Sequence, residues 1–76
     1  MAPFAKRGGH AKSMGYVLGD IFRVKPEYPQ QPHLRNAIVR LKLDDDTINP
    51  LFEVLLGPED DTGEVYWITL AWVEKL

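Results

Sequence analysis

The chain has 76 residues, 45% of them hydrophobic, and a formal net charge of −2. This length supports one small domain, and the absence of cysteine excludes disulfides as a source of stability. His10 and His33 are the only histidines, too few soft ligands for a structural zinc site, and the sequence contains no cofactor motif. We therefore expect no metal and no cofactor, which leaves self-association as the way to stabilise so small a core.

The charge of the chain is divided between its two halves. Residues 1–43 contain eight lysines and arginines against two acids, a balance of +6, whereas residues 44–76 contain one lysine against nine acids, a balance of −8. Such a split indicates either a charged partner or a fold that lays one half against the other.

Residues 1–15 are predicted to form a flexible basic arm, because they contain three glycines, no acid and no apolar period. Lys6, Arg7 and Lys12 give this arm its charge. No apolar run follows these bases, and no segment approaches the roughly 20 apolar residues of a membrane span. We expect a cytoplasmic protein that makes no membrane contact.

Residues 16–76 are predicted to form one all-β domain. Side chains alternate between two faces over residues 21–25 and 37–43, residues 51–56 and 65–70 are two further predicted strands, and a single turn leads into a short final strand over residues 71–76. In these strands Phe22 and Val24 share one face, as do Phe52, Val54 and Leu56. Three prolines exclude helix and strand from residues 26–36. The pattern predicts five short antiparallel strands in a small barrel or sandwich.

The order of these features resembles the Src-homology-3-like small β-barrel family. The opening strand reads Gly-Asp-Ile-Phe-Arg-Val over residues 19–24, a long irregular loop follows over residues 26–36, and three meandering strands come next. A one-turn helix over residues 70–72 then precedes the closing strand. The resemblance covers roughly residues 16–76 and implies a five-stranded Src-homology-3-like barrel, but it implies no function.

Alternation also sets the expected register of the second and third strands. Matching their apolar faces places Leu43 opposite Phe52 inside the fold and Lys42 opposite Glu53 outside it. Part of the charge split is then neutralised between adjacent strands.

The next hairpin, matched in the same way, places Leu55 opposite Trp67 on the outer side of the sheet. Leu51, Leu55 and Trp67 then form an exposed apolar row, which is typical of a protein–protein interface with tryptophan as its anchor. The alternative is that this row belongs to the core. Tyr28, in the proline-rich loop, is a further candidate contact residue. We expect a non-catalytic interaction module that forms a homo-oligomer or binds a protein partner.

Nucleic-acid binding is the alternative function. Cations of the arm and of the outer strand face could neutralise phosphates, although the acidic net charge is atypical of a dedicated nucleic-acid binder. The candidate residues are Lys6, Arg7, Lys12, Arg23, Lys25, Arg40 and Lys42.

Enzyme activity is not expected from this sequence. Ser13 is the only serine and lies on the predicted arm, so a nucleophile–histidine–acid triad has no fixed nucleophile. The stretch Val65-Tyr66-Trp67-Ile68 corresponds to the pore strand of plasmid-type dihydrofolate reductases. Tyr66 and Ile68 replace the glutamine and tyrosine that serve the ligands in that family, so reductase activity is not predicted. An active site formed between subunits is the remaining enzymatic alternative.

Overall fold

The structure is a computed structural model that describes residues 9–44, 49–58 and 61–76. A short helix, α1 (Gly9–Ser13), precedes the strands β1 (Ile21–Val24), β2 (Ile38–Leu43), β3 (Leu51–Leu56), β4 (Val65–Trp67) and β5 (Val73–Lys75). Two single 3-10 turns, η2 (Pro32–Leu34) and η3 (Leu70–Trp72), lie before β2 and before β5. None of the helices in the described ranges has the length and apolar character needed to span a bilayer.

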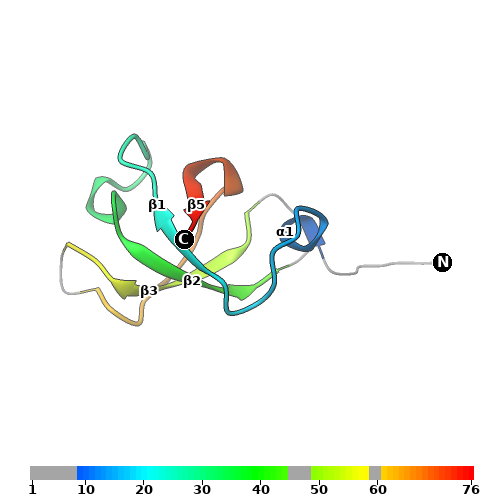
Figure 1. Cartoon of the computed structure of the whole chain (residues 1–76). Helices are drawn as coiled ribbons and strands as arrows, with labels where there is room; N and C mark the ends of the chain where they lie inside the picture. Colours follow the sequence, from blue (N-terminus) through cyan, green and yellow to red (C-terminus); the bar gives the residue numbers. More distant parts are fainter. Residues whose placement is uncertain (1–8, 45–48, 59–60) are drawn as a thin grey trace.

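The five strands form one antiparallel sheet in the order β4-β3-β2-β1-β5. Figure 1 shows the central strands β1, β2 and β3 crossing the molecule, with β5 beside β1 and α1 at one end. This arrangement confirms the prediction of an all-β fold with five antiparallel strands. The sheet is open, because its hydrogen-bonded order ends at β4 on one side and at β5 on the other.

Alternation predicted correctly which side chains face the core. Phe22 and Val24 on β1, like Phe52 and Val54 on β3, are completely buried, whereas their neighbour Arg23 is exposed. Phe22 contacts Phe52 edge to face, with 5.4 Å between the ring centroids. The core therefore lies on one face of the sheet, and we call the opposite face the outer face.

The register of β2 against β3 differs from the prediction by two residues. Phe52 is opposite Leu41 instead of Leu43, and Glu53 is opposite Arg40 instead of Lys42. The pairing is also interrupted by register shifts between Leu41 and Leu43 and between Ile38 and Val39, each of which places an extra residue on one strand. Leu43, expected inside, is consequently 47% exposed.

The register of β3 against β4 differs by four residues. Trp67 is opposite Leu51, whereas the sequence predicted Leu55 as its partner. Gly63 has a φ of 91°, a conformation that favours glycine, and its backbone N–H donates to the Val54 carbonyl at 2.8 Å. The turn that leads into β4 therefore closes on Val54. Leu56 lies beyond the residues of β3 that pair with β4, and its side chain is exposed rather than inside. A four-residue shift keeps the residues that pair between β3 and β4 on their expected faces, because the period of a strand is two.

The proline-rich loop between β1 and β2 contributes to the core. Its Tyr28 and Leu34 are buried, and Arg35 Nε donates to the Tyr28 carbonyl at 2.6 Å. The ring of Tyr28 lies 6.4 Å from that of Trp72 in η3. This loop and η3 thus cover the core side of the sheet near β1 and β5.

Residues 9–15, expected to belong to a flexible arm, are held by the body of the protein. The Asp44 carboxylate accepts hydrogen bonds from the backbone N–H groups of Ala11 at 3.0 Å and Lys12 at 2.9 Å. Ala11 is completely buried in the core cluster. The described part of the predicted arm thus forms α1 and contacts the body, and residues 1–8 lie outside the described residues.

Candidate functional site: the outer face of the sheet

The outer face carries the side chains that alternate with the core residues. Cross-strand pairing groups them into rows, because residues opposite each other in a sheet point to the same side. One row joins Leu43 on β2, Leu51 on β3 and Trp67 on β4. We call these three residues the Trp67 row. Trp67 is 53% exposed although it is large and apolar, which is atypical of an isolated sheet face.

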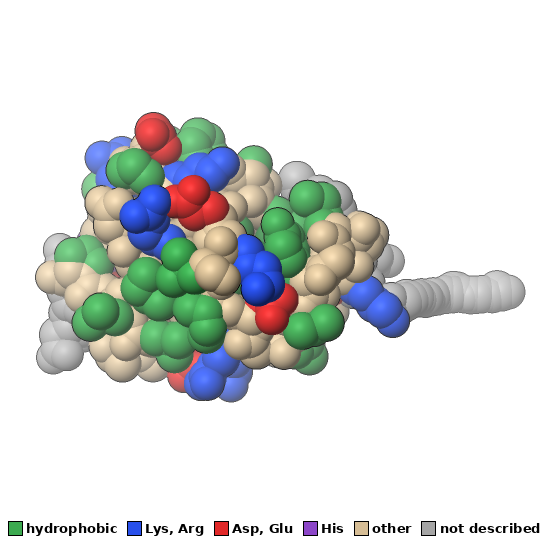
Figure 2. All heavy atoms as spheres, in the orientation of Figure 1, with side chains coloured by type: hydrophobic (Ala, Val, Ile, Leu, Met, Phe, Trp, Pro, Cys, Tyr) green, Lys and Arg blue, Asp and Glu red, His purple; other side chains and the backbone are tan. Residues whose placement is uncertain are grey.

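A second apolar group lies towards the other end of the same face. Ile38 is paired with Leu56, and the backbone N–H of Leu76 donates to the Ile21 carbonyl at 3.0 Å. Leu56 is 67% exposed, the largest exposure of any large hydrophobic side chain in the described ranges. Figure 2 shows hydrophobic side chains gathered into one area over β2 and β3 and below the C-terminal end.

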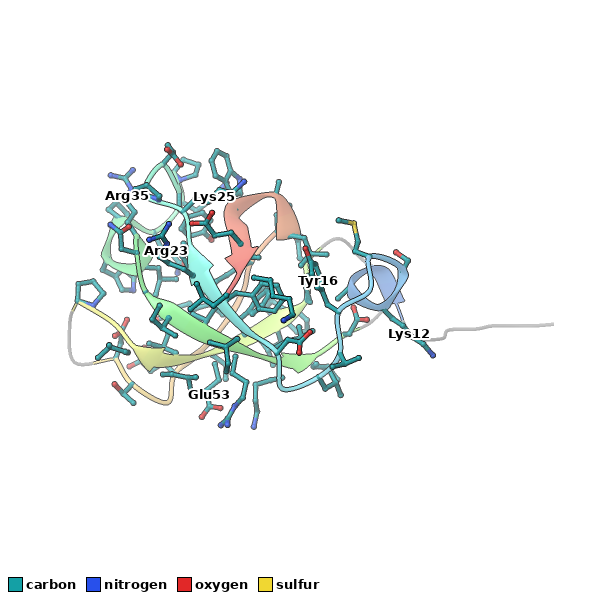
Figure 3. The ribbon with its side chains drawn as sticks, viewed as in Figure 1. Lys12, Tyr16, Arg23, Lys25, Arg35 and Glu53 are labelled. Carbon is teal, nitrogen blue, oxygen red and sulfur yellow. The ribbon has the colours of Figure 1, made fainter. Side chains whose placement is uncertain are left out.

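A compact ion cluster lies between the two apolar groups. Arg40 Nη2 donates to Glu53 Oε1 at 2.8 Å, and Lys42 Nζ lies 3.8 Å from the same oxygen. The hydrogen bond from Arg40 lowers the pKa of Glu53 below its ordinary value, and the Lys42 ammonium adds to this effect. Figure 3 shows Glu53 projecting from the underside of the sheet, so these charges belong to the outer face.

The expected basic surface is divided and partly neutralised. Arg23 forms an ion pair with Glu74, with Nε donating to Oε2 at 2.9 Å, while Arg40 and Lys42 share Glu53. Figure 3 places Arg23 near Lys25 and Arg35, away from Glu53. Arg23 is opposite Ile38 and so shares the outer face with Arg40 and Lys42, but it lies towards the other end of that face, and all three cations are paired with carboxylates.

The other predicted cations lie elsewhere. Lys12 is in α1, Lys25 follows β1, and Lys6 and Arg7 lie outside the described residues. Figure 3 shows Lys12 at the far end of the molecule from Lys25.

Tyr28 does not contribute to a surface. Its side chain is 3% exposed and belongs to the core cluster, and burial raises the pKa of its hydroxyl. Leu51 and Leu55 are half-buried on the outer face. Of the four expected interface residues, Trp67 is thus the most exposed, and the structure adds Leu43 to its row.

Two features of the structure have no counterpart in the sequence reasoning. The first is an open apolar hollow of about 270 Å³ lined by Lys12, Tyr16, Val17, Leu18 and Asp44. Its only sequence signal is the short apolar run before Gly19. It exists because α1 packs against the body, which residues 9–15 alone do not predict.

The second feature is a small polar group around Asp61. This carboxylate is 8% exposed, and the Nε2 of His33 lies 3.9 Å from its Oδ2. The hydroxyl of Tyr66 lies 3.3 Å from His33 Nε2 and donates to Glu64 at 2.6 Å. Among the residues that the structure describes, neither Asp61 oxygen has a hydrogen-bond partner.

The described residues contain no cluster of three or more histidine, aspartate or glutamate side chains that could hold a metal ion. The chemistry available on the outer face is therefore that of contact: apolar area, one exposed tryptophan and charges that are already paired. Comparisons with protein families, with characterised proteins and with solved structures find no match for this chain.

Proposed function

We propose that this protein is a non-catalytic interaction module that associates with a second copy of itself through the outer face of its sheet. The observation that carries the proposal is the Trp67 row, Leu43–Leu51–Trp67, which leaves apolar side chains from three adjacent strands at the surface. Tryptophan is enriched among the residues that dominate the binding energy of interfaces, and an apolar area of this kind is typical of a contact surface.

A second copy suits this face because the face is complementary to itself. Glu53 offsets one of the two charges of Arg40 and Lys42 on this surface, so each copy offers both a carboxylate and cations to the other. Symmetric pairs of this type are the commonest protein oligomers, and each residue at such an interface is used twice. The small size of the domain increases the stability gained by association, since a chain of 76 residues buries only a limited fraction of its own surface when it folds alone.

We also propose that the domain is a Src-homology-3-like small barrel. The support is the order of its elements: a long loop between β1 and β2, three meandering strands, and the 3-10 turn η3 immediately before β5. The strand order β4-β3-β2-β1-β5, with first and last strands paired, supports the same topology. This fold would leave the outer face uncovered by any helix, as a contact surface requires.

Light scattering with in-line size exclusion tests the proposed association. We expect the wild-type chain to run as a dimer and Trp67→Glu to run as a folded monomer, with affinity reduced at least about 30-fold for the loss of a central anchor. Leu18→Glu is the matched control, because Leu18 is equally exposed (58%) but lies at the hollow beside α1 rather than on the outer face. A wild-type chain that stays monomeric at the highest attainable concentration would contradict the proposal.

A further inference from the structure

The edge strand β4 has an open side. The Glu64 carbonyl accepts from Val54 N–H at 2.9 Å, and Ile68 N–H donates to the Pro50 carbonyl at 3.1 Å, so Glu64 and Ile68 direct their backbone groups towards β3 and its preceding loop. Backbone direction alternates along a strand, so the N–H and C=O groups of Val65 and Trp67 point away from β3. No further strand lies on that side in the described sheet.

The side chains of β4 leave this edge accessible. Val65 is 48% exposed and Trp67 53% exposed, and the strand contains no charged residue and no proline. Natural sheets protect their edges with such residues, because unpaired strand backbone is a template for another strand. The other edge, β5, differs, since it contains Glu74 and Lys75. Of the two edge strands, β4 is therefore the one that lacks charged residues against pairing with another strand.

We infer that β4 is a strand-addition site at which a second copy of this chain pairs antiparallel, so that the two sheets become continuous. This inference rests on the proposed self-association and gives it one geometry: the copies join edge to edge, so their outer faces lie side by side and meet at Trp67 rather than stacking on each other. The two-fold axis passes beside Tyr66, which places Val65 of each copy opposite Trp67 of the other.

This register satisfies both the backbone and the side chains. Val65 and Trp67 are the residues whose N–H and C=O groups point outwards, so opposing them forms hydrogen-bonded pairs in both directions across the axis. A β-branched residue opposite an aromatic one is a favourable cross-strand pair. The Trp67 row of one copy then continues into Val65 and Glu53 of the other, because Glu53 is the β3 partner of Val65.

A second copy is favoured over a foreign strand because β4 is matched to itself. In antiparallel pairing about a two-fold axis, β4 of one copy lies against β4 of the other. This strand contains no charged residue, so the two copies of it do not repel each other. The outer faces of both copies then lie on the same side of the joined sheet, so Trp67 of each copy contacts Val65 of the other across the seam.

Val65→Pro tests the inference, with Val65→Thr as its control. Proline removes the outward N–H of Val65 without touching the bonds that Glu64 and Ile68 direct towards β3, and edge strands tolerate proline at such positions. Threonine keeps both the N–H and the β-branched shape. We expect Val65→Pro to weaken dimerisation about tenfold or more, because one hydrogen bond is lost in each copy, and Val65→Thr to leave it nearly unchanged.

Amide hydrogen exchange of the wild-type chain gives a test that needs no variant. We expect the Val65 and Trp67 amides to exchange more slowly at high protein concentration than after dilution. If Val65→Pro dimerises as the wild type does, or if these amides exchange equally fast at both concentrations in a chain that dimerises, the strand-addition inference is overturned. Trp67→Glu could still break the dimer in that case, so the proposed function would stand. A monomeric wild type would overturn both.

Discussion

Replacement of Asp44 tests how the N-terminal segment is held. Its carboxylate accepts the backbone N–H groups of Ala11 and Lys12 in the short helix α1, near the helix end at which backbone N–H groups need partners from outside the helix. Asp44 therefore caps a helix that is more than thirty residues away in the sequence. We predict that Asp44→Ala destabilises the protein and loosens α1, whereas Asp44→Asn, which keeps one oxygen acceptor, has about half the effect.

The expected magnitude follows from the two bonds that are lost. A side-chain cap contributes typically about 1 kcal/mol and up to about 2 kcal/mol to the free energy of unfolding. The Ala11 bond is part-buried and the Lys12 bond exposed, so we expect about 1–2 kcal/mol for Asp44→Ala. In a domain of this size each kcal/mol lowers Tm by roughly 4–8 °C.

Urea unfolding measures the global cost, and amide exchange at Ala11 and Lys12 measures the local one. Asp20→Ala is the control, because Asp20 Oδ2 accepts only the Val17 N–H, three residues away, in an exposed position. This control should leave the α1 amides as protected as in the wild type. Unchanged stability within about 0.5 kcal/mol, together with unchanged exchange at Ala11 in Asp44→Ala, would refute the capping role.

Two further substitutions test packing and charge. A Cβ added at Gly57 would lie 2.3 Å from Asp61 Oδ1, so Gly57→Ala should lower the unfolding free energy by about 1–3 kcal/mol in urea melts, and by clearly less in an Asp61→Ala background. Because Arg40 holds the pKa of Glu53 below its ordinary value, Glu53 stabilises the fold above its unfolded-state pKa and loses this effect as pH falls through its folded-state pKa. Unfolding measured at neutral and acidic pH should show the wild type losing more stability than Glu53→Gln, and an equal loss would contradict the role of Arg40.

Strand positions and faces were predictable because they depend on local alternation. Phe22, Val54 and their alternating neighbours lie on the predicted sides, since a period of two needs no knowledge of the partner strand. Register was not predictable, because it depends on where an extra residue interrupts the pairing, as at Leu41/Leu43. Shifts of two and four residues preserve the faces, so Leu51 and Trp67 lie on the predicted outer side. Leu43 and Leu56, expected inside, are exposed because each lies at a register shift.

The remaining differences come from contacts between distant residues. A five-residue helix is not stable by its own propensity, so α1 could not be read from residues 9–13 without the carboxylate of Asp44. Tyr28 was expected at the surface because prolines surround it, but proline excludes regular structure rather than burial. The loop returns across the sheet and places this ring near Trp72, a contact that no local pattern encodes.

The division of charge along the chain has a structural explanation in the sheet order. β1 lies between β2 and β5, and β2 lies between β1 and β3, so basic strands of the first half are placed directly beside acidic strands of the second. Arg23 is paired with Glu74 across β1 and β5, and Arg40 and Lys42 are paired with Glu53 across β2 and β3. The acids of the second half thus act as counterions within the fold. A polyanion would have to compete with these carboxylates for the three bases, whereas a second copy that approaches the outer face and the β4 edge leaves every one of these pairs intact.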